Sequence, residues 1–240
     1  MLILGIETST VQVGCAIGGH EGVLAMAQSA KGRRHAEHLT PSIDFVCRLA
    51  DVELAEISVV AVDVGPGLFT GLRVGVATAK SLAHAIGVPM IGVASLDLLA
   101  FPVRYTSRLI VAAIDARRGE LYYAFYRQVP GGIQRLGEHR IGSPDDLASE
   151  LLASGEEILL VGDGAHRYHA AFDGLAKVEL ADVGLSYPSA SSLVQLAHAQ
   201  ALREQFHRAA DVDPIYLRKP DAEINWAVRD RAPSAGGPRP

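Results

Sequence analysis

The stretch Gly65-Pro66-Gly67-Leu68-Phe69-Thr70-Gly71-Leu72-Arg73-Val74-Gly75 decides the fold, because it joins a strand directly to a helix. The run of β-branched residues over 59–64 precedes it and is typical of a buried strand. The residues from Leu72 to Ile86 predict a helix that ends at Gly87. Thr70 is the candidate N-cap of that helix.

The glycines of this turn admit two interpretations. Glycine permits φ > 0 and lets a ligand or another backbone come close, and a helix N-terminus attracts anions such as phosphate. A tight strand-to-helix turn that binds nothing has the same spacing, and spacing alone favours it. The stretch matches neither GxGxxG nor the phosphate loop GxxxxGK[ST], so no nucleotide site follows from it directly.

Size and charge exclude several classes of protein. The chain has 240 residues, of which 49% are hydrophobic, enough to bury a core in one large domain or two small ones. Its 22 Lys and Arg are outnumbered by 27 Asp and Glu, which argues against nucleic-acid binding by the chain alone. No apolar window reaches the ~18 residues of a membrane span, and no basic segment of a signal peptide is present. Cys15 and Cys47 fit buried thiols. We therefore expect a soluble cytoplasmic protein.

The two halves of the chain predict similar series of elements. Strands are expected over residues 2–6, 11–17, 23–27, 59–64, 90–93, 109–114, 120–127, 133–141 and 158–161. Helices are expected over residues 34–50, 72–86, 95–100, 144–152 and 190–208. Pro41 favours a start of the first helix nearer Thr40. Residues 213–218 predict an extended closing segment, and the Pro/Gly/Ser-rich end predicts disorder.

An internal repeat follows from this series. Each half reads β-hairpin, strand, helix, strand, and its first strand ends in an acidic residue, Glu7 or Asp115. Two such halves resemble the actin-like ATPases and sugar kinases, which implies an α/β fold with two tandem RNase H-like lobes and mixed sheets flanked by helices. The expected boundaries are 1–102 for the first lobe, 103–219 for the second and 220–240 for a flexible tail. The helix near 190–208 is a candidate to join the first lobe.

Several stretches together resemble the TsaB (YeaZ) family over nearly the whole chain. They are residues 3–10 (ILGIETST), the glycine stretch 65–75, residues 115–122 (DARRGELY) and residues 214–218 (PIYLR). Leu68, where the family usually carries serine, departs from the pattern. The resemblance implies a part in making threonylcarbamoyladenosine (t6A) at adenosine 37, beside the anticodon, in tRNAs that read codons beginning with adenine.

The catalytic relative of that family, TsaD, resembles this chain around residues 92–99 (GVASLDLL). TsaD-like proteins carry two histidines there at i, i+4, a spacing that can bind one metal. This chain has Ser95 and Leu99 at those positions, and leucine offers no donor atom to a metal. We therefore expect a non-catalytic subunit without a metal site.

A nucleotide or phosphate cleft remains a hypothesis. Glu7 and Asp115 are candidates to hold metal-bound phosphate, although acids at strand ends also cap nearby turns. The residues that the resemblance places at such a cleft are Glu7, Thr8, Ser9, Gly65, Gly67 and Asp115. We expect no tightly bound cofactor, and ATP or ADP with magnesium only in an assembled complex.

The resemblance also implies a partner surface on the helices 40–50 and 72–86. These would form a four-helix bundle, in a homodimer of the chain alone or in a heterodimer with a TsaD-like catalytic subunit. The expected interface residues are Leu39, Ile43, Cys47, Leu72, Gly75, Val76, Ala79 and Leu82. Burial of the second helix within one chain is the alternative. A TsaE-like ATPase is a further expected partner, and tRNA is expected to bind only through the complex.

Other candidate residues favour structural roles. His35 and His38 have a possible ligand spacing without an evident third ligand, and Arg117, Arg118 and Glu120 fit a charged hairpin tip. The competing function is an autonomous actin-like ATPase or small-molecule kinase. Magnesium-dependent ATP binding by the isolated chain would favour it.

Overall fold

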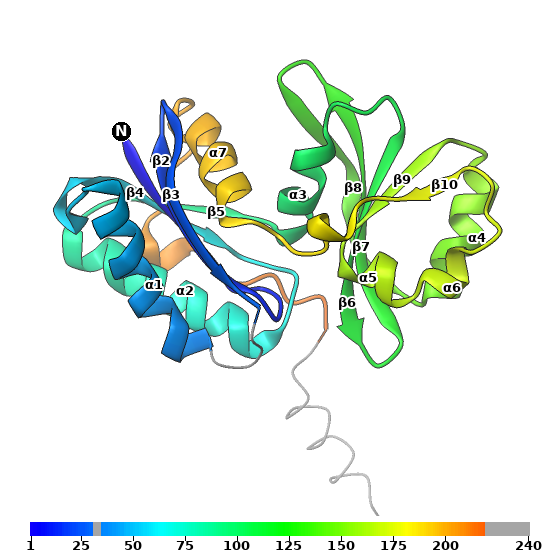
Figure 1. The fold of residues 1–240 in the computed structure, drawn as a ribbon, viewed down its shortest axis with the longest axis horizontal. Coiled ribbons are helices and arrows are strands. Elements are labelled where there is room, and N and C mark those ends of the chain that lie inside the picture. The colour runs from blue at the N-terminus through cyan, green and yellow to red at the C-terminus, as the bar shows by residue number, and fades with distance from the viewer. Residues whose placement is uncertain (31–34, 219–240) are drawn as a thin grey trace, which may run out of the picture.

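Two lobes, each built on a five-stranded sheet, make up the chain (Figure 1). The structure, a computed structural model, describes residues 1–30 and 35–218. The expected tail over 220–240 and the expected helix start at Arg34 lie outside these residues. The α/β fold with two RNase H-like lobes is confirmed.

The first sheet has the order β3-β2-β1-β4-β5. Its strands are β1 (Leu2–Glu7), β2 (Val13–Gly19), β3 (Gly22–Ser29), β4 (Ile57–Asp63) and β5 (Met90–Val93). The first three form the predicted antiparallel meander, whereas β4 is parallel to β1 and β5 is parallel to β4. β4 is apolar on both faces because helices cover both sides of the sheet at this strand.

The second sheet repeats this arrangement with the order β10-β9-β6-β7-β8. Its strands are β6 (Leu109–Arg117), β7 (Glu120–Val129), β8 (Gly132–Gly142), β9 (Ile158–Val161) and β10 (Val178–Leu180). β6, β7 and β8 are antiparallel, and β9 is parallel to β6. β6 therefore corresponds to β1 and β9 to β4, so the predicted internal repeat is present in the fold.

Helices cover both faces of the first sheet. α1 (His35–Ala50) and α2 (Phe69–Ile86) lie on one face, where Leu39, Ile43 and Val76 join its core. α7 (Ala190–Ala201) lies on the other, where Leu193 and Val194 pack against that sheet. α7 follows the whole second lobe in the chain, yet its apolar side belongs to the first sheet (Figure 1).

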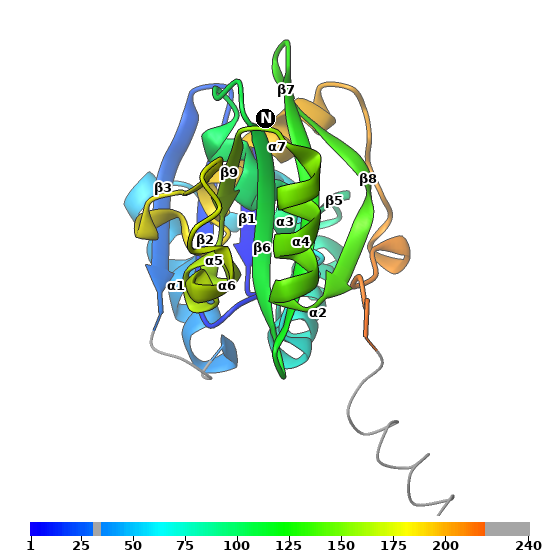
Figure 2. The same ribbon diagram turned by 90° about the vertical axis from the view of Figure 1, so that its right-hand side faces the viewer.

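The second sheet is also covered on both faces. α3 (Ser95–Ala100) packs on the side toward the first lobe, through Leu96 and Leu99. α4 (Pro144–Ser154), α5 (Asp163–Arg167) and α6 (His169–Phe172) lie on the opposite side, which faces the viewer in Figure 2. No helix in the described part of the chain is both long and apolar enough to cross a membrane.

Two expected helix boundaries were wrong, and so was the later start near Thr40 that Pro41 favoured for the first helix. α1 begins at His35 and contains Pro41, because the loss of one helical hydrogen bond is offset by burial of side chains on both sides of the proline. α2 begins at Phe69 after the N-cap Leu68, so Thr70 lies inside the helix. α7 ends at Ala201, since the chain then turns so that His207 pairs with Met90 through two backbone hydrogen bonds, of 2.8 and 2.9 Å.

The glycines of the strand-to-helix turn serve close packing within the chain. A Cβ added at Gly67 would overlap the backbone oxygen of Ser9, and one added at Gly75 would overlap Oγ1 of Thr8. Gly71 approaches the same loop, and Thr8 donates from Oγ1 to its carbonyl oxygen at 2.8 Å. α2 therefore lies directly on the loop after β1.

We expect Gly75→Ala to lower the free energy of unfolding by about 1–3 kcal/mol through overpacking against Thr8. The helix-forming preference of alanine, worth about 1 kcal/mol, opposes this loss and reduces it. Gly132→Ala is the matched control, because an added Cβ there meets no atom within 4 Å. Urea denaturation measures both, and equal stability of the two variants would contradict the packing role of Gly75.

Candidate functional site

The carboxyl end of β1 places Glu7 in a closed pocket. Its carboxylate is fully buried and accepts hydrogen bonds from the backbone N–H and the hydroxyl of Ser9, both at 2.7 Å. Thr8 and Ser9 are fully buried as well. Gly65 and Gly67 lie on the neighbouring turn after β4, and Leu68 donates its N–H to the carbonyl oxygen of Ser9 at 2.6 Å.

A second carboxylate, Asp63 at the end of β4, faces Glu7. Asp63 is fully buried, and its Oδ1 accepts from the backbone N–H of Gly65 at 2.7 Å and from Oγ of Ser95 at 2.6 Å. Oε2 of Glu7 and Oδ2 of Asp63 have no hydrogen-bond partner among the described residues. Two buried carboxyl groups with one unpartnered oxygen each are the arrangement in which a single shared proton is favourable.

Burial changes the proton affinity of this pair. Loss of solvent is the largest cause that raises the pKa of Asp63 to about 6. The pKa of Glu7 is raised well above its usual range, first by burial and then by the charge of Asp63. One of the two groups therefore holds a proton under conditions in which an exposed carboxyl group has lost it.

Asp115 occupies the equivalent place in the second lobe, at the end of β6. Its Oδ2 lies 2.9 Å from Nη1 of Arg117 and 3.2 Å from Nε of Arg167, and its Oδ1 accepts from the hydroxyl of Tyr168 at 3.1 Å. Asp163, after β9, accepts from the backbone N–H of Asp115 at 3.0 Å, and burial raises its pKa to about 6. The repeat thus pairs two acids in each lobe.

The structure brings together five of the predicted cleft residues, namely Glu7, Thr8, Ser9, Gly65 and Gly67, at one loop crossing, and it places Asp115 on the other lobe. The polar side chains of the cluster at Glu7 are buried and, apart from Oε2 of Glu7 and Oδ2 of Asp63, are bonded to the described part of the chain. The sequence reasoning missed Asp63 and Asp163. The signal for Asp63 was the one that found Glu7, an acid at the end of an apolar strand.

Ser95 and Leu99 also have internal roles. The Ser95 hydroxyl holds Asp63, and Leu99 is packed in the core beneath the second sheet. His35 is buried with Nε2 at 2.8 Å from the carbonyl oxygen of Thr10, which agrees with a structural role. Among residues 1–30 and 35–218, no three His, Cys, Asp or Glu side chains are placed to hold a metal ion.

The predicted partner residues on α1 and α2 divide into two groups. Leu39, Leu72, Gly75, Val76 and Ala79 are buried within the chain and line no open surface among the described residues, so a partner role for them stays a prediction. The buried face of α2, with Leu72, Gly75, Val76 and Ala79, rests on the sheet and on the Thr8 loop. Ile43 and Cys47 are also buried, but together with the half-buried Leu82 they line an open, mainly apolar groove of about 500 Å³ between the two helices.

More residues line the groove than the sequence predicted for the partner surface. Its other lining residues are Thr40, Asp44, Arg48, Asp51, Val52, Glu53, Leu54 and Thr78. The exposed apolar side chains Phe45 and Leu49 lie on α1 beyond it. Periodicity alone did not distinguish the sheet-facing side of α2 from the groove side, because small residues occupy most of the helix surface.

The raised pKa of Asp63 gives the stability of the protein a specific pH dependence. The folded chain holds a proton on Asp63 up to about pH 6, whereas an unfolded aspartate releases it near ~4. The folded state therefore binds more protons in this window, and the free energy of unfolding falls as pH rises from 4 to 6.

We expect Asp63→Asn to reduce that fall and to raise the free energy of unfolding at pH 8 by on the order of 2 kcal/mol. The asparagine oxygen keeps the bonds to Gly65 and Ser95, and its amide can donate to Glu7. Denaturant unfolding at several pH values measures this, with the exposed Asp173→Asn as control. A variant less stable than the wild type at pH 8, with the same pH slope, would contradict the shared proton.

Several known proteins are similar to this chain over most of its length. An uncharacterised protein of Mycobacterium leprae is 37% identical over 228 residues, which are 92% of this chain and 56% of that protein, so the chain spans little more than half of that relative. The tRNA threonylcarbamoyladenosine biosynthesis protein TsaB of Bacillus subtilis is 28% identical over 94% of this chain and 98% of its own length. The solved structure of YeaZ from Pseudomonas aeruginosa has a TM-score of 0.80 and 26% identity, covering 90% of this chain and 99% of that one.

Residues 27–226 match the protein family described as TsaD, tRNA N6-adenosine threonylcarbamoyltransferase. This match covers most of the chain, and the named relatives and the similar structure cover nearly all of it. The chain belongs to the TsaD family, in its TsaB (YeaZ) branch.

Proposed function

We propose that this chain is a non-catalytic subunit of the machinery that adds a threonylcarbamoyl group to N6 of adenosine 37 in tRNA. Relatives named tRNA threonylcarbamoyladenosine biosynthesis protein TsaB, from Bacillus subtilis, Haemophilus influenzae and Escherichia coli, support the role in t6A biosynthesis. The family likeness alone does not separate a catalytic from a supporting subunit, so the local chemistry decides that part of the proposal.

The observation that carries the proposal is the use made of Ser95 and Leu99. At the positions where TsaD-like proteins carry a histidine pair, one side chain anchors a buried aspartate and the other fills the core. Neither can turn outward without breaking the packing at the junction of the lobes. A metal that activates a substrate therefore has no ligands at this place in the chain.

The groove between α1 and α2 is the surface that we propose for a TsaD-like catalytic subunit. Its floor is apolar and its rim carries Asp44, Arg48 and Glu53, as in protein interfaces with an apolar centre and a polar edge. The chain alone would use the same surface for a homodimer, so the two associations exclude each other. The TsaE-like ATPase, tRNA and a magnesium nucleotide belong, in this proposal, to the assembled complex.

We expect Leu54→Asp to abolish co-purification with a TsaD-like protein, because the new carboxylate would be buried without a partner in the groove. Leu152→Asp on α4 is the matched control: Leu54 is 38% exposed and Leu152 69%, so neither change opens the core. Circular dichroism checks that both variants are folded. A folded Leu54→Asp variant that still binds at wild-type affinity would place the interface elsewhere.

We expect the isolated chain, supplied with threonylcarbamoyl adenylate and tRNA, to form no t6A. Adding a TsaD-like protein and a TsaE-like ATPase with ATP should restore the reaction. Nucleoside analysis of digested tRNA measures the product. Formation of t6A by this chain alone would overturn the non-catalytic assignment, and magnesium-dependent turnover of ATP by it would favour the autonomous ATPase instead.

A further inference from the structure

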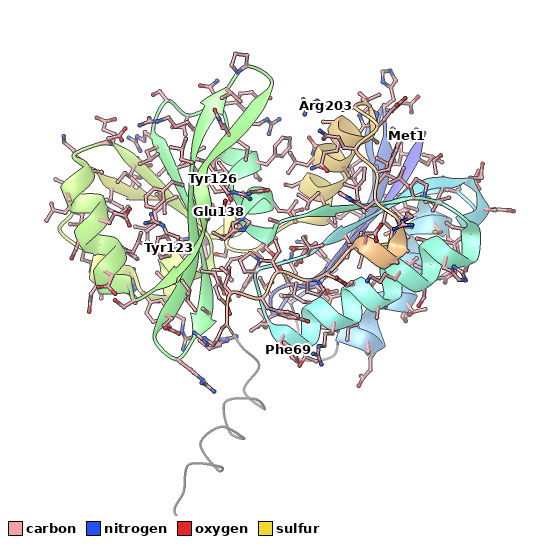
Figure 3. All side chains as sticks on the ribbon, turned by 180° about the vertical axis from the view of Figure 1, so that it is seen from behind. Met1, Phe69, Tyr123, Tyr126, Glu138 and Arg203 are labelled. Carbon is pink, nitrogen blue, oxygen red and sulfur yellow. The ribbon has the colours of Figure 1, made fainter. Side chains whose placement is uncertain are left out.

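A large cavity lies between the lobes, at the edge opposite to Glu7 and Asp115. It has a volume of about 910 Å³ and is lined by the turn after β2, by α3, by α7 and by the hairpin of β7 and β8. The turn after β2 and the β7–β8 hairpin lie at the amino ends of β1 and β6, because β2 runs antiparallel to β1 and β7 runs antiparallel to β6. Figure 3 shows Arg203 beyond the end of α7 and Tyr126 on the second lobe, two of its lining residues.

The cavity carries an excess of cationic side chains, although the whole chain has a net charge of −5. Its ionisable lining residues are Arg104, Arg135, Arg203, His20, His198 and Asp97. The single carboxylate, Asp97, is already engaged: it accepts from the hydroxyl of Tyr126 at 2.8 Å and from Nη1 of Arg135 at 3.1 Å. The remaining arginines therefore present uncompensated charge to the cavity.

The chain holds one of these arginines, Arg104, in a fixed orientation. Its guanidinium lies 3.9 Å from the ring centre of Phe101 and 4.3 Å from that of Tyr105. It donates to the carbonyl oxygen of Phe101 and to the hydroxyl of Tyr105, each at 2.9 Å. A guanidinium that is positioned before binding loses less freedom when it pairs with an oxyanion.

Aromatic and amide groups surround this charge. Tyr105 is 77% exposed, so its ring offers a surface on which a planar group can stack. Gln128, Gln134 and Gln200 also line the cavity, and each offers both a donor and an acceptor. A simple oxyanion would leave most of 910 Å³ empty, whereas a ligand with phosphate, sugar and base matches the size and the mixture of groups.

We propose that this cavity binds a nucleotide, free or within a single-stranded RNA segment, with its phosphate facing Arg203 and Arg104 and its base against Tyr105. The site is separate from the acidic cluster at Glu7 and needs no magnesium. The proposal does not rest on the role of the chain in t6A biosynthesis. It assigns a ligand to the amino-terminal edge of the lobes, where the acidic pairs of the repeat are absent.

Isothermal titration calorimetry of the full chain with ADP, and separately with a five-nucleotide oligoadenylate RNA, tests the proposal. EDTA in the buffer removes divalent cations, so that a magnesium-dependent site does not contribute. We expect at least one probe to bind, and Arg203→Gln to weaken its binding about tenfold through loss of a charge-assisted contact. Tyr105→Ala should weaken the same probe about tenfold, because it removes the stacking surface and the contacts that hold Arg104.

Two further variants fix the location. Arg208→Gln has the same change in charge and an exposed side chain, which pairs only with Asp211 in the described structure, and it should leave binding unchanged. Glu7→Gln should leave it unchanged as well, because Glu7 lies at the other edge. Binding of ADP alone identifies a free nucleotide as ligand, and binding of the oligonucleotide alone identifies RNA.

The proposal is overturned if neither probe binds at millimolar concentration. It is overturned equally if Arg208→Gln weakens binding as much as Arg203→Gln, since that would show non-specific charge attraction. Loss of binding in Glu7→Gln, with Arg203→Gln unaffected, would move the nucleotide to the opposite edge. Both arginine variants change exposed side chains, so circular dichroism and the unfolding midpoint should match the wild type.

Discussion

The close contact between α2 and the loop after β1 positions most of the first lobe. Without Cβ atoms at Gly67, Gly71 and Gly75, the helix backbone rests on the backbone of Thr8 and Ser9. That contact carries a hydrogen bond from Leu68 to Ser9 and another from Thr8 to Gly71. It holds the turn after Asp63 against the loop after Glu7, and it sets how α2 stands beside α1. The closure of the chain over the acidic pair and the groove between the helices both depend on it.

The two edges of the lobes therefore differ in chemistry. At the carboxyl ends of β1 and β4 the chain closes over its own polar groups and buries two carboxyl groups with raised pKa values. At the amino ends it leaves a large cavity lined by arginines that have few acidic partners. The net charge of −5 gives no sign of this difference, because a sum over the sequence does not show how the charges are distributed in the folded protein.

Much of the fold could be predicted from the sequence, since short apolar strands, glycine turns and amphipathic helices leave local signals. The strand over residues 158–161 and the helix over 95–100 were predicted at their observed limits. The side chains that face each other across sheets could not be paired in this way. Asp63 meets Glu7 only because β4 pairs with β1 in one register, and α2 carries small residues on several faces, so its sheet-facing side has no distinctive pattern. The arginines of the interlobe cavity come from separate elements and share no spacing at all.

The position of α7 in the chain determines when the first lobe can complete its core during synthesis. A ribosome delivers all strands of the first sheet by residue 93, yet one face of that sheet stays uncovered until residues 190–201 have emerged. During that interval Ile3, Ala61 and Ile91 face water or the nascent second lobe. The first lobe therefore completes its core last, although its strands are synthesised first. Until then the apolar face of the first sheet lacks the helix that covers it in the finished protein, which makes this the face most prone to association during synthesis.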